Sequence, residues 1–525
     1  MTSLRFTSDS AHLAAHEKGL AESLGLFAVE PEDLDVTLMD TFDGRLVAEG
    51  SVLLRRNVSP DQWELNWTGL ARDVDLGRLV VDRTPRLDRD ALPTGPVTAR
   101  LERAIDIRAL LPLARVQGTA RVWEKRDQRG KLVLRVVVEP ASTVRSPGGR
   151  RRRALPAQIH VFGLHGYEKP FERARAAVGR LRSIEISDRP WAIDVLRAAG
   201  HDPGRDPSKI DVALDPTAPP REALRDLCAS YVRVIRANRE GARAALDPEF
   251  LHDLRVAVRR TRTLLKASRR LWPAPLWERF RVEFRWLARA TSEARDLDVY
   301  LLDFEDLRDR LPAADRACLD PVHAWLERAR DRVGTELDAQ LQSERLDSLL
   351  TDFHALLTSR AFTPDGASRD ESTADFAIAS LQRAHRRILR DGRRIDEASP
   401  DQDLHDLRKR TKELRYLLEG FRPLFPGRKV REQIKSLKDL QENLGVHQDR
   451  VVQAHTLRTI ALDLEDAPAA TLVALGFLIE QLLHDAQTYR DDFARRFRAY
   501  DDSERLADFE KMLDRARRAD REAAR

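Results

Sequence analysis

The sequence predicts an α+β domain with an antiparallel, barrel-like sheet, followed by an all-α domain of two tandem helical bundles with pseudo-two-fold symmetry. Short apolar runs with period-two alternation dominate residues 1–200, whereas helical periodicity dominates from residue 222 onward. The helical part also repeats itself: the chain after residue 376 follows the plan of the chain after residue 222. Finally, 34% of the 525 residues are charged and 6% are aromatic, a balance that favours helices over an all-β protein.

Residues 1–200 contain the alternation expected of strands with one solvated face. Residues 63–67, with the sequence Trp-Glu-Leu-Asn-Trp, alternate apolar and polar side chains. The runs 116–123 and 131–139 flank a turn-like Asp-Gln-Arg-Gly tetrapeptide at 127–130 and predict a hairpin. The other elements expected in this domain are a strand at 157–164 and helices at 11–24 and 172–181.

A stretch rich in Pro, Asp and Gly at 201–221 predicts a linker. The helical domain is expected over 222–515, with one repeat at 222–358 and the other at 376–515, and with prolines at helix boundaries. A break that contains Pro364 separates the repeats, and the charged tail beyond 515 is expected to be frayed. The expected helices are 221–243, 249–271, 275–290, 293–310, 313–358, 376–396, 402–422, 428–444, 446–464 and 467–500.

The repeat is clearest in a stretch that begins at His252 and again at His405, 153 residues later. A second block has the same offset, since Ala-Arg-Asp at 294–296 corresponds to His-Gln-Asp at 447–449. Two blocks that share one offset indicate an internal duplication. Two bundles packed about a pseudo-two-fold axis would turn both stretches toward one groove.

Each copy carries a stripe of basic side chains on one helix face, separate from its apolar face. Like charges at this spacing cost roughly 0.2–0.5 kcal/mol per pair, so a stripe kept in both copies favours a surface that binds a polyanion over an ordinary solvated face. Neighbouring positions are expected to vary freely, as Arg260 corresponds to Glu413 and Lys266 to Glu419. The candidate binding residues are His252, Arg255, Arg259, Arg262, His405, Arg408, Lys412 and Arg415, with Arg233, Arg386, Arg285 and Lys438 as weaker candidates from the duplication alone.

The two histidines leave two interpretations open. Each could contact phosphate, where a protonated ring would add charge at mildly acid pH. Each could instead cap its helix or bond a carboxylate, with Asp296 and Asp449 as the nearest candidates. These two aspartates are expected to be structural and to orient an Arg or a His.

The helical part resembles the CHAD family, the conserved-histidine α-helical domain. The resemblance covers about 222–510 and rests on residues 252–262 with 294–299, and on residues 405–416 with Leu444 and Gly445. It implies a helical domain with a basic cavity that binds inorganic polyphosphate, in a family associated with polyphosphate granules. The chemistry agrees, because a linear phosphate chain has no base edges to recognise and needs only cations at intervals.

The N-terminal region resembles the CYTH family, the triphosphate-tunnel fold, in residues 39–46, 53–56 and 121–126. The resemblance implies a Glu-x-Glu-x-Lys strand that holds a divalent metal, but residues 4–8 read Leu-Arg-Phe-Thr-Ser, and the later strand carries Gln158 and His160. Since Mg²⁺ binds phosphates through carboxylates, we expect a degenerate domain without catalysis. Four cations either line the barrel or point outward: Arg55, Arg56, Lys125 and Arg126.

The leading interpretation is a polyphosphate-binding protein of the cytoplasm that docks on polyphosphate granules. The alternatives are a metal-dependent triphosphatase or polyphosphatase of the CYTH type and a nucleic-acid-binding protein, although few aromatic residues accompany the stripes. The net charge of only +5 makes the basic stripes local features. Cys228 and Cys318 lack metal-ligand spacing, and no cofactor, signal peptide or membrane span is expected. Homo-oligomerisation remains open.

Overall fold

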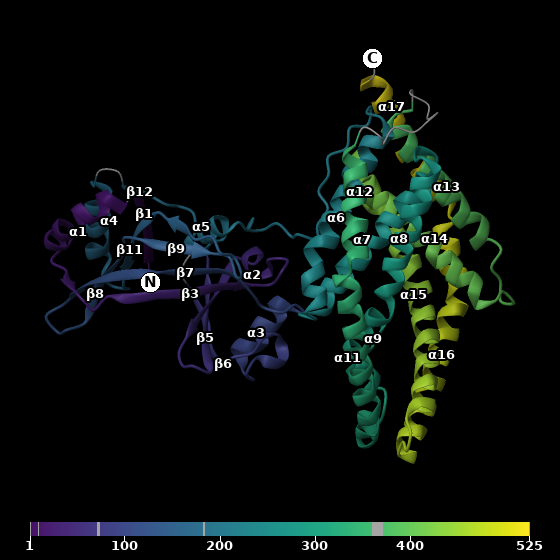
Figure 1. Ribbon diagram of the computed structural model, residues 1–525, viewed down its shortest axis with the longest axis horizontal. Helices are drawn as coiled ribbons and strands as arrows, with labels where there is room; N and C mark the ends of the chain where they lie inside the picture. Colours follow the sequence, from purple (N-terminus) through teal and green to yellow (C-terminus); the bar gives the residue numbers. More distant parts are fainter. Residues whose placement is uncertain (1, 9, 71–73, 182–183, 360–370, 524–525) are drawn as a thin grey trace. The chain divides into compact units, whose positions relative to one another are not determined.

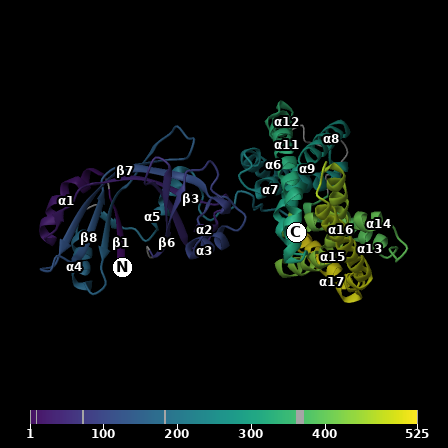
Figure 2. The same ribbon diagram turned by 90° about the horizontal axis from the view of Figure 1, so that it is seen from below.

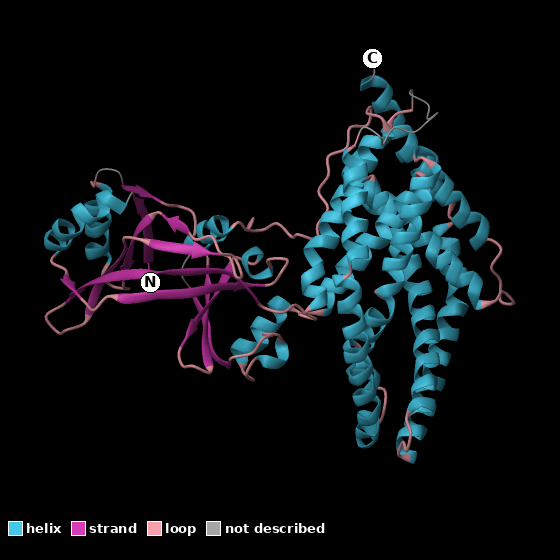
Figure 3. Cartoon of the chain, viewed as in Figure 1, coloured by secondary structure: helices cyan, strands magenta, loops and turns pink. Residues whose placement is uncertain are grey.

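The computed structural model describes residues 2–8, 10–70, 74–181, 184–359 and 371–523. The chain forms two compact units, Met1–Lys209 and Ile210–Arg525. The first contains all the described strands and the second is helical, as the colouring by secondary structure shows (Figure 3). The predicted order of an α+β domain and an all-α domain is therefore confirmed. The predicted break around Pro364 lies mostly outside the described residues.

The first unit is a curved antiparallel sheet with the strand order β12-β1-β11-β8-β7-β3-β4-β5-β6 (Figure 1 and Figure 2). Within the described residues the edge strands β12 and β6 do not pair, so the sheet is open rather than a closed barrel. The predicted hairpin is β7 and β8, joined by a turn in which Gly130 has a positive φ of 76°. The strands are β1 (Thr2–Ser8), β2 (Phe27–Ala28), β3 (Glu32–Asp40), β4 (Ser51–Asn57), β5 (Gln62–Gly69), β6 (Asp75–Asp82), β7 (Leu111–Arg126), β8 (Leu132–Glu139), β9 (Ser142–Arg145), β10 (Arg153–Leu155), β11 (Ala157–Gly163) and β12 (Ile184–Ile186).

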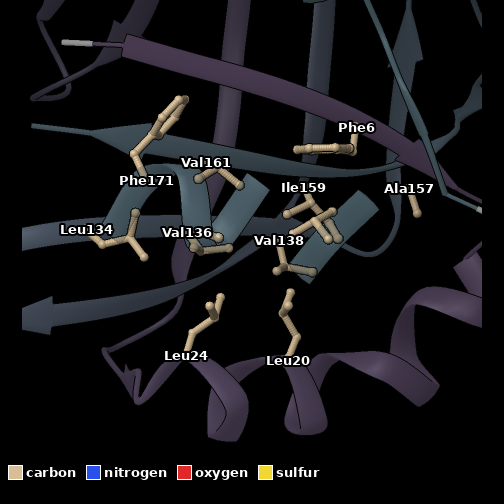
Figure 4. Close-up of a cluster of buried hydrophobic side chains, with 12 residues drawn as sticks. Phe6, Leu20, Leu24, Leu134, Val136, Val138, Ala157, Ile159, Val161 and Phe171 are labelled. Carbon is tan, nitrogen blue, oxygen red and sulfur yellow. The ribbon is translucent and has the colours of Figure 1, made fainter. Parts of the chain in front are cut away.

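Two pairs of helices cover opposite ends of one face of this sheet. At one end α1 (Ser10–Leu24) and α4 (Glu168–Gly179) bury Leu20, Leu24 and Phe171 against Val138 and Ile159 (Figure 4). At the other end lie α2 (Arg45–Ala48) and α3 (Pro96–Ile105), whose apolar side chains join a second core with β4 and β5. A short 3₁₀ turn, η1 (Arg89–Ala91), precedes α3.

The opposite, concave face of the sheet holds a third core built on α5 (Trp191–Ala199), a helix that period-two alternation did not reveal. Val195 and Leu196 of α5 pack with Val36 of β3 and Val116 of β7. Successive side chains on a strand point to opposite faces, which is why Val36 and Val116 lie here while Thr37 and Arg115 lie on the other face.

The second unit repeats its helices at the offset found in the sequence. The helix α7 (Pro248–Ala267) recurs as α14 (Asp401–Gly420), with both ends shifted by 153 residues. From α6 to the start of α11 the equivalent of a residue is found by adding 153, whereas α12 and α17 begin 159 residues apart because α16 is longer than α11. The other pairs are α6 (Pro220–Arg243) with α13 (Thr373–Gly392), η2 (Arg269–Leu271) with η4 (Arg422–Leu424), α8 (Ala274–Ala290) and α9 (Ser292–Leu302) with α15 (Gly427–Asp463), α11 (Asp320–Gln342) with α16 (Ala469–Tyr500), and α12 (Glu344–Thr358) with α17 (Ser503–Ala523). The short α10 (Phe304–Arg308) and η3 (Ala313–Leu319) connect α9 to α11.

Two hydrogen bonds join positions that are equivalent in the duplication. The Tyr300 hydroxyl donates to the Gln453 carbonyl oxygen at 2.7 Å, and the Thr471 hydroxyl donates to the Cys318 carbonyl oxygen at 2.8 Å; each pair is 153 residues apart. A position can touch its own equivalent only near the axis that relates the two copies. The halves are therefore related by a pseudo-two-fold axis, as predicted.

Several helix predictions were wrong in detail. The helix expected over 293–310 is divided into α9 and the short α10. The helix expected over 313–358 is split at Ser343, whose side chain caps α12 by accepting from the Leu346 N–H. The helices expected at 428–444 and 446–464 are one helix, α15. Its Leu444 takes the place of Thr291, the residue at which the first copy is interrupted and whose hydroxyl donates to the Leu287 carbonyl oxygen. The tail is helical to Ala523, buries Ala516 and accepts a hydrogen bond from Ser372 Oγ at Asp520 Oδ2, so it is not frayed from 515.

Among the described helices, α16 alone is long and apolar enough to pass a composition test for a membrane span, with a mean hydropathy of 1.3 over its best window. A third of that window is buried inside the second unit, and Leu472, Val473 and Phe477 of the helix are exposed. Leu475, Leu478 and Leu482 are buried along one side of it, and it packs along α15. A core helix of a folded bundle passes the same test.

Candidate functional site

A groove of about 550 Å³ lies between the two halves of the helical unit, with walls from α7, α8 and α14. Its lining holds eight Lys or Arg side chains and one carboxylate, so the groove is strongly positive. The lining residues are Arg259, Arg262, Thr263, Leu265, Lys266, Trp277, Arg281 and Arg285 from the first half, and His405, Arg408, Lys409, Lys412, Glu413 and Tyr416 from the second.

Six of the twelve candidate binding residues meet in this groove. They come from both copies, and the equivalent residues Arg259 and Lys412 lie close enough for the charge of Arg259 to lower the pKa of Lys412. The two basic stripes therefore face one shared space. The six are Arg259, Arg262, Arg285, His405, Arg408 and Lys412.

Lys412 is the most perturbed of the groove cations. Burial, and then the charges of Arg408 and Arg259, lower the pKa of its ammonium group to about 7, against a smaller opposing effect of Asp449. The neighbouring Arg262 is affected in the same way, since burial and then Arg285 lower its pKa. An anion in the groove would relieve this repulsion.

Several donors at the groove are buried without a protein acceptor. Arg408 donates from Nη2 to Asp449 Oδ1 at 2.9 Å, which places Asp449 in its expected orienting role, but Arg408 Nε has no hydrogen-bond partner. His405 Nδ1 is likewise buried without a hydrogen-bond partner. A buried donor without an acceptor costs about 1–3 kcal/mol, so the site is arranged for acceptors from a ligand.

Arg255 does not line the groove, although its equivalent Arg408 does. Arg255 is buried and donates to the Ala288 carbonyl oxygen at 3.1 Å and to Thr291 Oγ1 at 2.9 Å. These acceptors lie where α8 ends and α9 begins, so its guanidinium bonds the backbone at the helix break. Burial lowers the pKa of Arg255 to about 10. In the second copy α15 is unbroken, and Arg408 has no such acceptor.

His252 lies at the start of α7, away from the groove lining, where it sits beside Glu249 and Asp253. One ligand atom from each of these three residues lies within 4.8 Å of the others. Arg415 lies with its guanidinium 5.4 Å from the ring centre of Tyr416 and 3.6 Å from a carboxylate oxygen of Glu419. The other candidates outside the lining are Arg233, which is half-buried on α6, and the exposed Arg386 and Lys438.

Matching across the duplication missed three groove cations. Lys266, Arg281 and Lys409 line the groove, but their equivalents are Glu419, Ile434 and Val256. Of these three, only Lys409 could have been predicted from helical spacing, because it precedes Lys412 by three residues and so lies on the same helix face.

The positions next to the stripes do not vary freely, contrary to the prediction. Arg260 Nη2 pairs with Glu419 Oε2 at 2.7 Å, and Lys266 Nζ pairs with Glu413 Oε2 at 2.6 Å. Glu419 is the equivalent of Lys266, and Glu413 is the equivalent of Arg260. The two ion pairs therefore cross the pseudo-two-fold axis. Two identical copies would bring like charges together here. The divergence to glutamate in the second copy therefore holds the halves together beside the groove.

The concave face of the first unit carries polar residues where the family resemblance implies paired carboxylates. Arg5 of β1 is buried and donates to Gln158 Oε1 at 3.2 Å and to Asp194 Oδ2 at 2.5 Å. Glu139 lies 3.5 Å from His160, and burial raises its pKa to about 7 and lowers that of His160 to about 4. One carboxylate that favours its neutral form, beside a buried arginine, does not fit a divalent metal site.

The four cations left open in this unit mostly face away from the concave interior. Arg55 lies on the opposite face, 4.1 Å from the ring centre of Trp63, and Lys125 donates to the Leu24 carbonyl oxygen at 2.8 Å on the α1 side. Arg56 is exposed. Arg126 donates to Glu124 Oε2 at 2.7 Å.

Residues 227–458 match the CHAD domain family. Uncharacterized proteins of two Mycobacterium tuberculosis strains, CDC 1551 and H37Rv, are 28% identical over 263 residues, and this chain spans about half (49%) of their length. The crystal structure of the CHAD domain from the plant Ricinus communis is 28% identical with a TM-score of 0.47, over 54% of this chain and 94% of that one. PptA from Streptomyces chartreusis is 20% identical with a TM-score of 0.43, over 54% of this chain and 100% of that one. By the family match, the helical unit of this protein contains a CHAD domain at residues 227–458.

Proposed function

We propose that the helical unit binds inorganic polyphosphate in the groove between its two halves. The observation that carries the proposal is the convergence of eight cations from both copies on one groove with a single carboxylate, Glu413, which Lys266 already pairs. The CHAD family is associated with polyphosphate binding, which supports the same ligand. Arginine forks and lysine point charges suit phosphate oxygens without reading any sequence.

Nucleic acid is a weaker candidate for this groove, because binding of single strands depends on stacking bases on aromatic rings. Trp277 and Tyr416 are the aromatic residues in the lining. Arg269 and Arg281 lie 4.8 and 5.5 Å from the ring centre of Trp277, and Tyr416 is buried. Neither ring offers an open face to a base.

The first unit is proposed to be a degenerate CYTH-like domain without triphosphatase or polyphosphatase activity. Arg5, Glu139 and His160 occupy the place of the expected metal ligands, and α5 fills the adjacent concave face with apolar side chains. The protein would then act in the cytoplasm by docking on polyphosphate granules rather than by hydrolysis. Phosphate release that requires Mg²⁺ would contradict this part of the proposal.

The test is a titration of long-chain polyphosphate into the full chain at two salt concentrations. The groove variant is Arg259→Ala/Lys412→Ala, and its matched control is Arg428→Ala/Lys435→Ala, which removes the same two charges from exposed positions of α15 outside the groove lining. Duplex and single-stranded DNA serve as competitors.

The groove variant is expected to lose at least about tenfold in affinity, and the slope of log affinity against log salt is expected to fall by roughly one to two, since two fewer cations release counterions. The control is expected to bind like the unmodified protein. Equal losses in the variant and the control would mean that net charge, not the groove, attracts the polymer. Displacement by DNA at matched charge concentration would favour the nucleic-acid alternative.

A further inference from the structure

A row of arginines crosses the convex face of the sheet in the first unit. The strand register places Arg145 of β9 beside Arg115 of β7, Arg115 beside Thr37 of β3, and Thr37 beside Arg55 of β4. Directly paired residues on neighbouring strands project from the same face. With about 4.8 Å between neighbouring strands, the arginines stand roughly 5 and 10 Å apart along a line perpendicular to the strands.

A fourth cation extends this row toward β6. Arg83, just after β6, and Arg55 lie 5.9 and 4.1 Å from the ring centre of Trp63 on β5. The four residues Arg55, Arg83, Arg115 and Arg145 are called the arginine row below.

The arginine row carries more positive charge than its surroundings neutralise. Within the described part of the chain, Asp35 is the carboxylate paired with the row, and it accepts from Arg115 Nε at 2.7 Å and Nη2 at 2.5 Å. Among the described residues no ion pair includes Arg55 or Arg145. Burial and then the charges of Arg115 and Arg83 lower the pKa of Arg55, which shows that like charges are crowded along this face.

The row also lies between the helices that cover the convex face. The core beneath α1 and α4 draws its buried strand residues from β1, β8 and β11, and the core beneath α2 and α3 draws them from β3, β4, β5 and β6, whereas β7 and β9, which carry Arg115 and Arg145, supply none to either. Arg115 is 34% exposed and Arg83 is exposed, while Arg55 and Arg145 are half-buried. The guanidinium groups are therefore held on a rigid sheet and open to a ligand.

We infer that the arginine row is a second site for a linear phosphate polymer, separate from the groove of the helical unit. Four cations in a line, each on a different strand or strand end, match an extended anion. The nearest aromatic, Trp63, is covered by Arg55 and Arg83 and cannot stack on a base, which favours a polymer that offers only phosphates. The inference uses the polymer of the proposed function but rests on other residues.

Two sites on one chain give long polymers an advantage over short ones. Once one site holds the polymer, the other meets it at high effective concentration, and avidity can exceed either affinity by about 10²–10⁴. A short oligophosphate that fills one site gains nothing from the second. The arginine row therefore makes a preference for long chains part of the binding.

The experiment uses the full chain and compares long-chain polyphosphate with tripolyphosphate. The row variant is Arg55→Gln/Arg145→Gln, which leaves the Arg115–Asp35 pair intact. The matched control, Arg56→Gln/Arg78→Gln, removes two charges from β4 and β6 on the opposite face, at positions that pair with Glu64 and Asn66. Both pairs of substitutions are also introduced into the groove variant Arg259→Ala/Lys412→Ala. Circular dichroism verifies that each variant folds.

The row variant is expected to bind the long chain at least about tenfold more weakly, with its tripolyphosphate affinity at the groove unchanged. The groove variant is expected to keep some binding of the long chain. This residual binding should disappear when the row substitutions are added and persist when the control substitutions are added. It should also persist when Arg55→Lys/Arg145→Lys is added, because the charges remain. Residual binding that survives the row substitutions would overturn the inference and leave the groove proposal intact. If single-stranded DNA displaces the polymer from the row, the site is a nucleic-acid site and the inference is wrong. Loss of all binding by the groove variant, with none left for the row to carry, would also refute it.

Discussion

Lys412 gives the groove a pH dependence whose sign and size follow from its surroundings. Its free-state pKa of about 7 reflects burial on α14, the charges of Arg408 and Arg259, and the weaker opposing charge of Asp449. A bound polyanion favours the protonated form, so the pKa rises on binding and the protein takes up a proton. Because only the protonated form contributes its charge, the affinity is expected to be higher at low pH and to fall as pH rises through 7.

The magnitude follows from the protonated fraction of the free protein. With a pKa near 7, that fraction falls from about nine tenths at pH 6 to about one tenth at pH 8, which corresponds to a loss of about tenfold in affinity, or roughly 1.4 kcal/mol. Calorimetry in buffers with different ionisation heats would then detect the uptake of nearly one proton at pH 8.

Lys412→Arg is the matched variant, since an arginine stays protonated throughout this range. It should bind with an affinity that hardly changes between pH 6 and pH 8. His405 is the other titratable group of the lining; burial, and then Lys409, lower its pKa, so it loses its charge at lower pH than a free histidine. Long polymers are used because their terminal phosphates, which also titrate, are then a small fraction of the ligand charge. A pH slope that is equal in the wild-type protein and in Lys412→Arg would refute the assignment to Lys412.

Three further predictions concern stability and the division of roles between equivalent residues. Arg260→Glu and Glu419→Arg should each lower the free energy of unfolding of the helical unit by about 1–2 kcal/mol, because the pair is only 23–24% exposed. The double variant should recover most of this loss. Urea unfolding that shows no coupling between the two substitutions would contradict the crosswise pairing. Arg255→Leu should cost about 1–3 kcal/mol of stability, because it leaves acceptors at the helix break unpaired. Arg408→Leu should weaken polyphosphate binding with little loss of stability. Measuring unfolding and binding for both variants tests whether the equivalent arginines differ in role. Asp40→Ala should lower the stability of the first unit by at least about 2 kcal/mol, since the Asp40 carboxylate accepts from the backbone N–H groups of Leu46 and Val47 in α2 and of Thr41. An unchanged melting temperature would show that water replaces the carboxylate.

Periodicity in the sequence predicted the helices and the hairpin whose formation depends on nearby residues. The apolar periodicity located α7 and α14 to within a few residues, and the two-residue alternation found the β7–β8 hairpin. The shared groove could also be predicted, because a duplicated helix bundle brings matching faces together. What alternation could not reveal was α5, a short helix whose place is set by the third core of the sheet.

The differences between equivalent residues depend on contacts that the sequence repeat does not show. Arg255 and Arg408 are the same residue in the same repeat position, but the break at Thr291 gives one of them backbone acceptors, and Leu444 keeps the other helix continuous. The glutamates opposite Arg260 and Lys266 looked like random divergence until the two-fold arrangement put them in contact. Such pairings are decided across the interface between halves, over more than 140 residues of chain.

The pseudo-two-fold axis between α7 and α14 has a consequence for any polymer in the groove. The axis brings the equivalent cations Arg259 and Lys412 together, but Arg262, Arg285, His405 and Arg408 have equivalents outside the lining, so the two ends of the groove differ. A linear phosphate chain is identical in both directions and meets these unequal ends in the same way whichever end enters first, whereas a nucleic acid strand, with a 5′ and a 3′ end, meets them differently in its two orientations. For the polymer proposed here both orientations fit, which favours binding by RT ln 2, about 0.4 kcal/mol, and lets the chain move through the groove without a preferred direction.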